Sequence, residues 1–202
     1  MEYQTIKFSI LGETAVGKSS FIKRFCEDKF SNQYISTMGF SYTIKGIQVE
    51  NQNYRLTFND VSGDDTYLTT VIPKIINSTA ILFMYDVTKK ESFGFISKWI
   101  ETVKENNIID GLQMYLIGSK IDLESDREIP KEVGKEVAER IGMDFLEISS
   151  KSGENIKEAM LFIIKKALKL SNDFSGEIIM DQKNINQEKK NNKKKKWTFC
   201  CS

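Results

Sequence analysis

The sequence predicts an α/β fold, with a mostly parallel six-stranded β-sheet, one antiparallel edge strand, and helices on both faces. Strand-like and helix-like segments alternate along the chain, which is the order that builds such a sheet. A glycine-rich turn joins the first strand directly to the first helix. Three strand-like segments are almost entirely apolar, as strands buried on both faces are: residues 79–86, 111–118 and 144–149. Ligands of such a sheet bind beyond the carboxyl ends of its strands.

The remaining elements follow from hydrophobic spacing. Residues 3–11 read as a strand, and residues 19–28 have the apolar spacing of a helix. Two alternating runs, at 40–49 and 54–60, flank a turn-like Asn-Gln-Asn and predict a β-hairpin. Further helices are expected near residues 91–107, 130–141 and 154–170.

Length and composition suit one domain. The chain has 202 residues, of which 40% are apolar and 28% charged, which is ordinary for a soluble globular protein. Its first ten residues include an acidic side chain and alternate polar with apolar residues, so they do not resemble a signal peptide. The longest apolar run, at 80–85, is far shorter than the ~20 residues of a membrane span. Three cysteines cannot form a disulfide framework, which favours a reduced, cytosolic protein.

The two ends of the chain differ in composition. Residues 1–170 carry the periodic patterns and a slight excess of acidic side chains. Residues 171–202 are rich in Asn, Lys, Gln and Asp, with seven lysines against four acidic residues. We therefore expect a folded domain over 1–170 and a disordered basic tail over 171–202. The short apolar stretch at 177–180 in this tail suggests a docking segment for an escort protein.

The glycine-rich turn is a phosphate-binding motif. Gly12-Glu-Thr-Ala-Val-Gly17-Lys18-Ser19 matches G-x-x-x-x-G-K-[ST] after a strand and before a helix, the context that this motif requires. Its backbone N–H groups and the helix N-terminus attract phosphates, Lys18 reaches the β- and γ-phosphates, and the Ser19 hydroxyl suits Mg²⁺. The predicted phosphate contacts are Thr14, Ala15, Val16, Gly17, Lys18, Ser19 and Ser20.

A second motif indicates which base a bound nucleotide would carry. Ser119-Lys120-Ile121-Asp122 follows the strand at 111–118. The Asp122 carboxylate at this edge can accept hydrogen bonds from both N1–H and the 2-amino group of guanine, a donor pair that adenine lacks. On its own, K-x-D is also what an exposed charged turn contains, so its position after a predicted sheet strand is what favours guanine.

Taken together, these segments resemble the small GTPases of the Ras superfamily, and within it the Rab family most. The resemblance runs from about residue 7 to residue 170 and is carried by four further stretches. They are YISTMGFSY (34–42), which resembles switch I, ILFMYDVTKKESF (81–93), SKWIETVKEN (97–106), and EISSKSGENI (147–156), which resembles the guanine-contacting E-x-S-A-K loop.

The resemblance implies a GTP/GDP site with Mg²⁺. It assigns Ser19, Thr37 and Asp60 to the metal, and the Gly63 amide to the γ-phosphate. On the base, it implies that Phe30 stacks while Lys120 and Lys151 pack along the ring. The implied nucleotide contacts beyond the phosphate loop are Phe30, Tyr34, Thr37, Gly63, Ser119, Lys120, Asp122, Ser149, Ser150 and Lys151.

Three departures from the family pattern affect function. Asp64 stands where the family has the Gln that orients the attacking water, and an ionised carboxylate cannot donate a hydrogen bond. With Lys18, Thr37, Gly63 and Asp64 as the catalytic set, we expect slow intrinsic hydrolysis. Ser119 replaces the family's Asn, and its shorter side chain is expected to loosen the bridge from the base to the phosphate loop. The aromatic trio that contacts Rab effectors is reduced to Tyr42, Asn59 and Lys74.

The C-terminus resembles the Rab ending C-C-X, which implies geranylgeranyl groups on Cys200 and Cys201. Six clustered lysines upstream would add attraction to an anionic leaflet. A nucleic-acid-binding arm is the competing use of such lysines, and the paired cysteines favour the membrane. The resemblance also implies an exchange factor, a GTPase-activating protein, escort and dissociation-inhibitor proteins, and effectors.

Three functions compete at this stage. The leading hypothesis is a Rab-like GTP/GDP switch on the cytoplasmic face of an intracellular membrane, with a cytosolic pool, acting in vesicle trafficking. The second is a pseudo-GTPase that holds GTP and recruits effectors with negligible hydrolysis. The third, a P-loop nucleotide kinase, lacks the arginine-rich lid segment that such enzymes use, since the arginines are Arg24, Arg55, Arg127 and Arg140.

Overall fold

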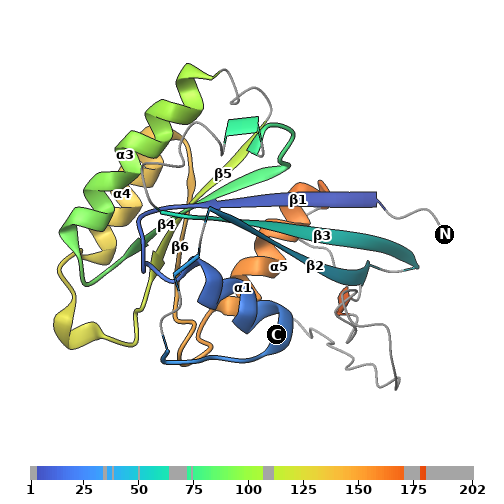
Figure 1. The fold of residues 1–202 in the computed structure, drawn as a ribbon, viewed down its shortest axis with the longest axis horizontal. Coiled ribbons are helices and arrows are strands. Elements are labelled where there is room, and N and C mark those ends of the chain that lie inside the picture. The colour runs from blue at the N-terminus through green and yellow to red at the C-terminus, as the bar shows by residue number, and fades with distance from the viewer. Residues whose placement is uncertain are drawn as a thin grey trace.

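A seven-stranded sheet forms the centre of the molecule, with strand order β6-β5-β4-β1-β3-β2-β7 (Figure 1). The computed structural model describes residues 4–33, 36–37, 39–49, 51–63, 72–73, 75–106, 112–170 and 178–180. The strands are β1 (Gln4–Leu11), β2 (Phe40–Val49), β3 (Gln52–Val61), β4 (Ala80–Asp86), β5 (Gln113–Ser119), β6 (Asp144–Ile148) and β7 (Ile178–Met180). Strands β1, β3, β4, β5 and β6 run parallel, whereas β2 is antiparallel to both β3 and β7.

Helices cover both faces of this sheet (Figure 1). They are α1 (Lys18–Glu27), α3 (Lys90–Glu105), α4 (Lys131–Ile141), α5 (Ile156–Ala167) and the short 3₁₀ helix η2 (Glu124–Asp126). Helices α1 and α5 pack in one hydrophobic cluster with Phe8 and Leu82, while α3 and α4 pack in a second cluster with Phe83 and Leu116. Because successive side chains of a strand point to opposite faces, Leu82 and Phe83 serve the two clusters.

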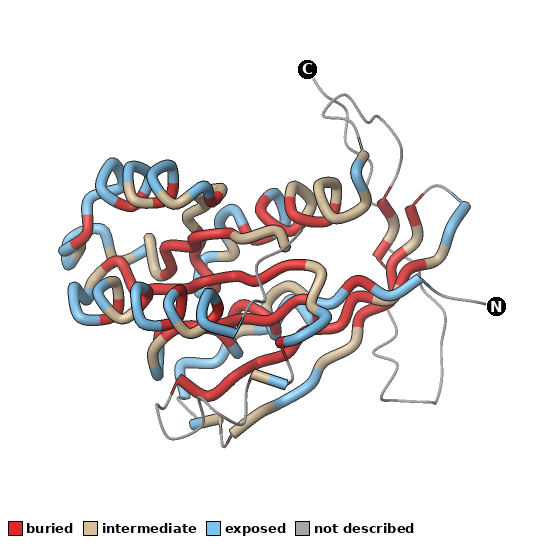
Figure 2. The backbone as a smooth tube through the Cα atoms, turned by 90° about the horizontal axis from the view of Figure 1, so that it is seen from above, coloured by how far each residue is buried: buried red, intermediate tan, exposed pale blue. Residues whose placement is uncertain are grey.

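The central strands are buried along most of their length (Figure 2). Every residue of β4 is buried, which agrees with the almost unbroken apolar run that predicted a strand covered on both faces. Carboxyl ends of parallel strands meet at one edge of the sheet, so the segments after β1, β3, β4, β5 and β6 gather there. No helix in the described part of the chain is long and apolar enough to cross a membrane.

The predicted fold class is confirmed, and the sheet has one strand more than expected. Residues 178–180, which we assigned to a disordered tail, form β7, which pairs with the second half of β2. Ile178 and Met180 are 5% and 8% exposed and join the cluster of α1 and α5. This apolar stretch thus packs on the chain's own sheet edge. Its three residues lie among polar neighbours, and so short a run carries little periodicity.

Candidate nucleotide-binding site

A cavity of about 440 Å³ opens at the carboxyl ends of the strands. The predicted nucleotide contacts that line it are Thr14, Ala15, Val16, Gly17, Lys18, Ser19, Ser20, Phe30, Thr37, Gly63, Ser119, Lys120, Asp122, Ser150 and Lys151. These residues come from segments that are far apart in the sequence, so their convergence is a property of the fold. A cavity of this size is within the range of small-molecule sites.

The phosphate loop enters α1 through Gly17, whose φ of +104° lies in the left-handed region that favours glycine. Lys18, the first residue of α1, is 5% exposed, and its Nζ donates to the carbonyls of Gly12 at 2.8 Å and Glu13 at 2.7 Å. Burial lowers the pKa of Lys18 to about 8, while the carboxylates of Asp60 and Glu13 act in the opposite direction. The loop therefore presents a largely desolvated cation beside a helix N-terminus, the charge that phosphates need.

Three oxygen-bearing side chains meet next to this lysine. The Ser19 hydroxyl donates to Asp60 Oδ2 at 2.5 Å, and its Oγ lies 3.0 Å from Thr37 Oγ1. Asp60 Oδ1 is buried and has no hydrogen-bond partner within the described residues. Burial raises the pKa of Asp60, with the Ser19 hydrogen bond and the Lys18 charge opposing that shift. Hydroxyl and carboxylate oxygens with an unpaired acceptor fit a hard cation such as Mg²⁺.

The segment after β3 closes against the phosphate loop. A Cβ atom on Gly63 would lie 2.2 Å from the Thr14 backbone nitrogen, so only glycine allows this close approach. Ser62 N–H donates to the Gly39 carbonyl at 2.9 Å, which links this segment to the start of β2. The segment that carries Gly63 is thus joined to the predicted switch I segment beside the cavity.

On the opposite side of the cavity, Asp122 is held by its neighbours. The Ser149 hydroxyl donates to Asp122 Oδ1 at 2.5 Å, and Lys151 Nζ lies 3.8 Å from Asp122 Oδ2. Ser149 does not line the cavity and supports Asp122 from behind. We predicted Ser149 among the nucleotide contacts, and its position indicates that it acts indirectly, by orienting Asp122.

Arg24 of α1 fixes the segment that follows β6. Its Nε donates to the Ser150 carbonyl at 2.8 Å and its Nη2 to the Lys151 carbonyl at 2.7 Å. We did not identify Arg24 as a site residue from the sequence. The signal that could have found it is a basic side chain on the helix that begins at the phosphate loop, since that helix must run beside the site.

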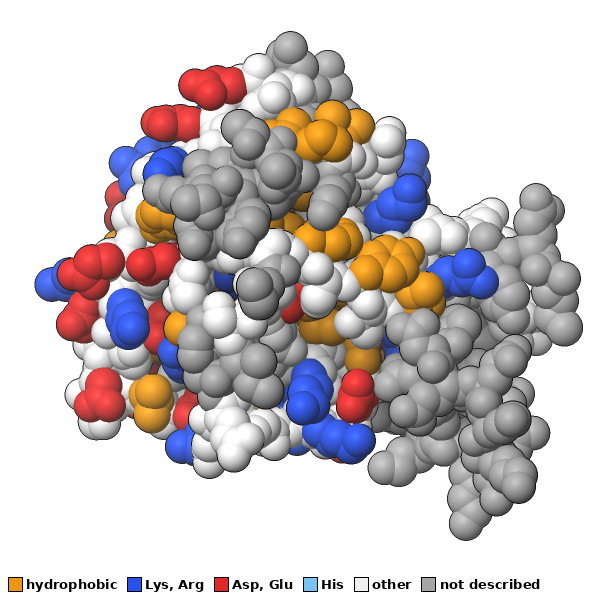
Figure 3. Space-filling model, viewed as in Figure 1, with side chains coloured by type: hydrophobic (Ala, Val, Ile, Leu, Met, Phe, Trp, Pro, Cys, Tyr) orange, Lys and Arg blue, Asp and Glu red, His pale blue; other side chains and the backbone are white. Residues whose placement is uncertain are grey.

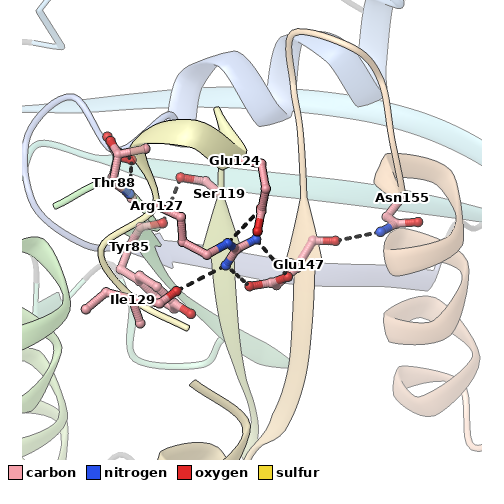
Figure 4. A network of polar contacts seen from close by, with 9 residues as sticks. Tyr85, Thr88, Ser119, Glu124, Arg127, Ile129, Glu147 and Asn155 are labelled. Carbon is pink, nitrogen blue, oxygen red and sulfur yellow. Dashed lines mark hydrogen bonds and ion pairs between the residues drawn. The ribbon is translucent and has the colours of Figure 1, made fainter. Parts of the chain in front are cut away.

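Ser119 makes a bridge that we expected its short side chain to loosen. Its Oγ lies 2.6 Å from the Val16 carbonyl in the phosphate loop and 2.7 Å from the Tyr85 carbonyl (Figure 4 shows Ser119 beside Tyr85). The side chain is 2% exposed, because β5 brings it directly against the loop. A hydroxyl donates one hydrogen bond at a time, so Ser119 serves either carbonyl but not both.

A polar network joins the segments after β5 and within β6 (Figure 4). Arg127 Nη1 donates to Glu147 Oε1 at 2.7 Å, and Arg127 Nε donates to Glu124 Oε2 at 2.8 Å. Asn155 Nδ2 donates to the Glu147 carbonyl at 3.0 Å. Arg127, Glu124, Glu147 and Asn155 also line a hollow of about 880 Å³ at the β6 edge of the sheet. That hollow contains no residue of the phosphate loop, so its greater size does not make it the better nucleotide site.

Several predicted residues lie outside the described part of the chain: Tyr34, Asp64, Lys74, Cys200 and Cys201. Of the predicted effector positions, Tyr42 is 48% exposed, whereas Asn59 is buried and donates to Ser9 Oγ at 3.0 Å. Figure 3 shows apolar side chains gathered toward the middle of one face, with charged side chains around them. Asn59 therefore stabilises the interior of the sheet and is too buried to form a surface for an effector.

A phosphate loop of this form, at the carboxyl end of a parallel sheet, defines the class of P-loop nucleotide-binding proteins. The sequence model of the Ras family matches residues 7–169, and the chain belongs to that family. It is a Rab-like small GTPase, which binds GTP and GDP and hydrolyses GTP.

Individual relatives agree with this membership. The chain is 34% identical over 162 residues to Ras-related protein Rab-13 of Canis lupus familiaris, which covers 80% of this chain and 79% of that protein. It is 30% identical over 200 residues to Ras-related protein Rab-8 of Diplobatis ommata, covering 97% and 95%. It is also 35% identical over 159 residues to EF-hand calcium-binding domain-containing protein 4B of Homo sapiens. That match covers 79% of this chain but only 22% of the other protein.

Proposed function

We propose that this chain is a membrane-anchored GTP/GDP switch of vesicle trafficking that turns over GTP slowly. The observation that carries the proposal is the convergence of the phosphate loop, Thr37 and the Asp122 segment on one cavity, with Asp60 directly behind Ser19. Its likeness over nearly the whole chain to proteins named Rab supports the trafficking role.

On the base side, Asp122 accepts hydrogen bonds from N1–H and the 2-amino group of guanine. Its carboxylate is oriented for this by Ser149, and its side chain remains 16% exposed toward the cavity. Phe30, Lys120 and Lys151 line the same cavity and pack against the faces of the base. The exclusion of adenine follows because adenine has no donor pair for one carboxylate.

On the phosphate side, Lys18 turns its ammonium from the Gly12 and Glu13 carbonyls toward the β- and γ-phosphates. Ser19, Thr37 and Asp60 would hold Mg²⁺, which would supply positive charge to neutralise the phosphates. The amides of the phosphate loop and of Gly63 donate to the phosphate oxygens. Catalysis would therefore be mostly electrostatic, and the lining of the cavity by Lys18, Gly63 and the phosphate loop supports this.

The slow turnover rests on Asp64. A carboxylate has no proton to donate to the transferring phosphoryl group, and its charge repels the γ-phosphate. Its ordinary pKa of ~3.9 also makes it a weak base for water. We expect intrinsic hydrolysis at or below the ~10⁻⁴ s⁻¹ of Ras-like enzymes, and a GTP state that persists until an activating protein supplies the missing groups.

Membrane attachment is proposed through prenylated Cys200 and Cys201, strengthened by Lys193 to Lys196. Two lipids make anchoring stable, whereas basic residues alone bind a membrane that salt can release. An exchange factor, an activating protein, escort proteins and effectors would act on this cycle.

Single-turnover hydrolysis of bound GTP tests the enzymatic part. The wild type and Asp64→Gln are compared with and without a Rab-activating domain. We expect the wild type alone to be slower than Asp64→Gln, with the difference reduced when the activating domain is present. Equal rates without the domain would contradict the role given to Asp64, and equal binding of ATP and GTP in calorimetry would contradict the guanine site.

A further inference from the structure

Asp86 ends β4 and is the least exposed charged side chain in the described part of the chain, at 1%. Its backbone N–H donates to Ser92 Oγ at 3.0 Å. Its Oδ1 accepts two hydrogen bonds from Thr88, one from the backbone N–H at 3.0 Å and one from Oγ1 at 2.7 Å. Both the backbone and one carboxylate oxygen are therefore fixed in place.

The second carboxylate oxygen faces the nucleotide side. Asp86 Oδ2 lies 2.5 Å from Lys120 Nζ. Within the described residues, Lys120 is the cation that pairs with this oxygen, and no further hydrogen bond reaches it. A buried carboxylate without its partner is strongly unfavourable, so the pair holds Lys120 firmly.

Lys120 is the member of the pair that reaches the ligand space. It lines the cavity and its side chain is 33% exposed, whereas Asp86 does not line the cavity. Its φ of +65° is in the left-handed region that non-glycine residues seldom adopt. Asp86 pairs with Ser119 across β4 and β5, and Val87 N–H donates to the Ser119 carbonyl at 3.1 Å. The backbone next to Lys120 is therefore tied to the strand that carries Asp86.

From this geometry we infer that Asp86 is a positioning residue for guanine binding and acts through Lys120. The carboxylate holds the ammonium at the rim, so the methylene stem of Lys120 lies along the cavity before the nucleotide arrives. A free lysine loses side-chain entropy when it is ordered, and ordering it in advance removes that cost from binding. The inference rests on the proposed contact of Lys120 with the base.

The other lysine at the base shows the contrast. Lys151 is 58% exposed, and its Nζ lies 3.8 Å from Asp122, whose carboxylate also serves the base. An ion pair at this distance, with its lysine mostly exposed, does little to order that lysine. Lys120 has a dedicated buried carboxylate, so we expect it to be the more important of the two for retention of the nucleotide.

The test is a double-mutant cycle on the dissociation rate of a fluorescent GDP analogue from the full chain. Asp86→Asn keeps the shape of the side chain and an oxygen for Thr88, but removes the charge that holds Lys120. Lys120→Met keeps most of the apolar stem without the ammonium. We expect each single change to raise the rate about tenfold, and the double variant to match Lys120→Met. Glu128→Gln, at an exposed carboxylate outside the cavity lining, is the matched control and should leave the rate unchanged.

A purely structural Asp86 would raise the rate by the same factor with or without Lys120, and that result overturns the inference. An effect of Lys120→Met with none from Asp86→Asn overturns it too, but leaves the proposed function intact. If Lys120→Met leaves the rate unchanged, Lys120 makes no contact with the base. That result contradicts both the inference and the contact assigned to Lys120 in the proposed function. Asp86→Asn should also affect GDP and inosine diphosphate equally, because Lys120 does not read the 2-amino group. If Asp86→Asn does not fold, Thr88→Ala, which removes the Oγ1 donor, replaces it in the same cycle.

Discussion

The two halves of the nucleotide cavity are built differently. On the base side, charged and polar groups already have partners of the protein's own: Asp86 with Lys120, Ser149 with Asp122, and Arg24 with two backbone carbonyls. On the phosphate side, Lys18 is buried against neutral carbonyls, and Asp60 keeps an unpaired buried oxygen. The base side is thus ordered before the ligand binds, whereas the phosphate side is electrostatically complete only with nucleotide and metal.

Lys18→Met tests the phosphate side and should have the largest effect. We expect affinity for GDP to fall roughly 100-fold or more, because charge-assisted hydrogen bonds to phosphate are lost. The free energy of unfolding of the nucleotide-free protein should change by no more than about 1 kcal/mol, because the loss of two hydrogen bonds and of the attraction to Asp60 is offset by removal of the cost of burying the ammonium. Calorimetry and denaturant unfolding measure the two quantities. A large loss of stability without nucleotide would contradict the difference that we describe between the base side and the phosphate side.

Asp122→Asn tests the base side by changing the carboxylate that we propose recognises guanine. GDP affinity should fall roughly 100-fold and xanthosine diphosphate should become the preferred ligand, because a carboxamide can donate to a 2-oxo group. Ser149 can still donate to the carboxamide oxygen, so stability should be nearly unchanged. Competition between the two nucleotides measures the exchange of preference, and retention of the original preference would place guanine recognition elsewhere.

Arg24→Gln tests whether the base side is held in order from a distance. Two carbonyls lose their donors, so we expect GDP release to be roughly five- to tenfold faster without a change in the preference for guanine. Arg140→Gln, at an exposed arginine near the end of α4, is the matched control. An effect no larger than that of the control would show that the Ser150 segment is ordered without Arg24.

Ser119 connects the two halves, and its variants should have the smallest effects. Ser119→Ala removes one neutral hydrogen bond and should speed GDP release by up to about tenfold. Ser119→Asn should slow release by less than that, because the hydroxyl already makes the bridge to the phosphate loop. Stopped-flow release of the nucleotide distinguishes the two. Faster release from Ser119→Asn would mean that the buried space beside Val16 does not admit the larger side chain.

The features that depend only on neighbouring residues were predicted well from the sequence. The almost entirely apolar run of β4 and the motif from Gly12 to Ser19 specify local structure, so their positions followed from spacing alone. Asp86 and Arg24 were not identified, because their partners lie 34 and 126 to 127 residues away in the chain and meet them only in the folded sheet. The contact of Ser119 with the Val16 carbonyl was not predicted either, for a related reason. The reach of a side chain depends on how closely β5 approaches the loop, and no local pattern encodes that distance.

The short strand β7 also fixes the place on the domain from which the C-terminal segment departs. Twenty residues separate Met180 from Cys200, whereas thirty separate Leu170 from it. For a chain anchored through Cys200, the fully extended tether is about 70 Å with β7 paired and about 100 Å without it. The shorter tether raises the effective concentration of the lipid end around the domain by about twofold. It would also start at the β2 edge of the sheet and not at the end of α5. If the proposed anchor is present, these three paired residues would set how far the domain can lie from the bilayer and which edge of the sheet faces it.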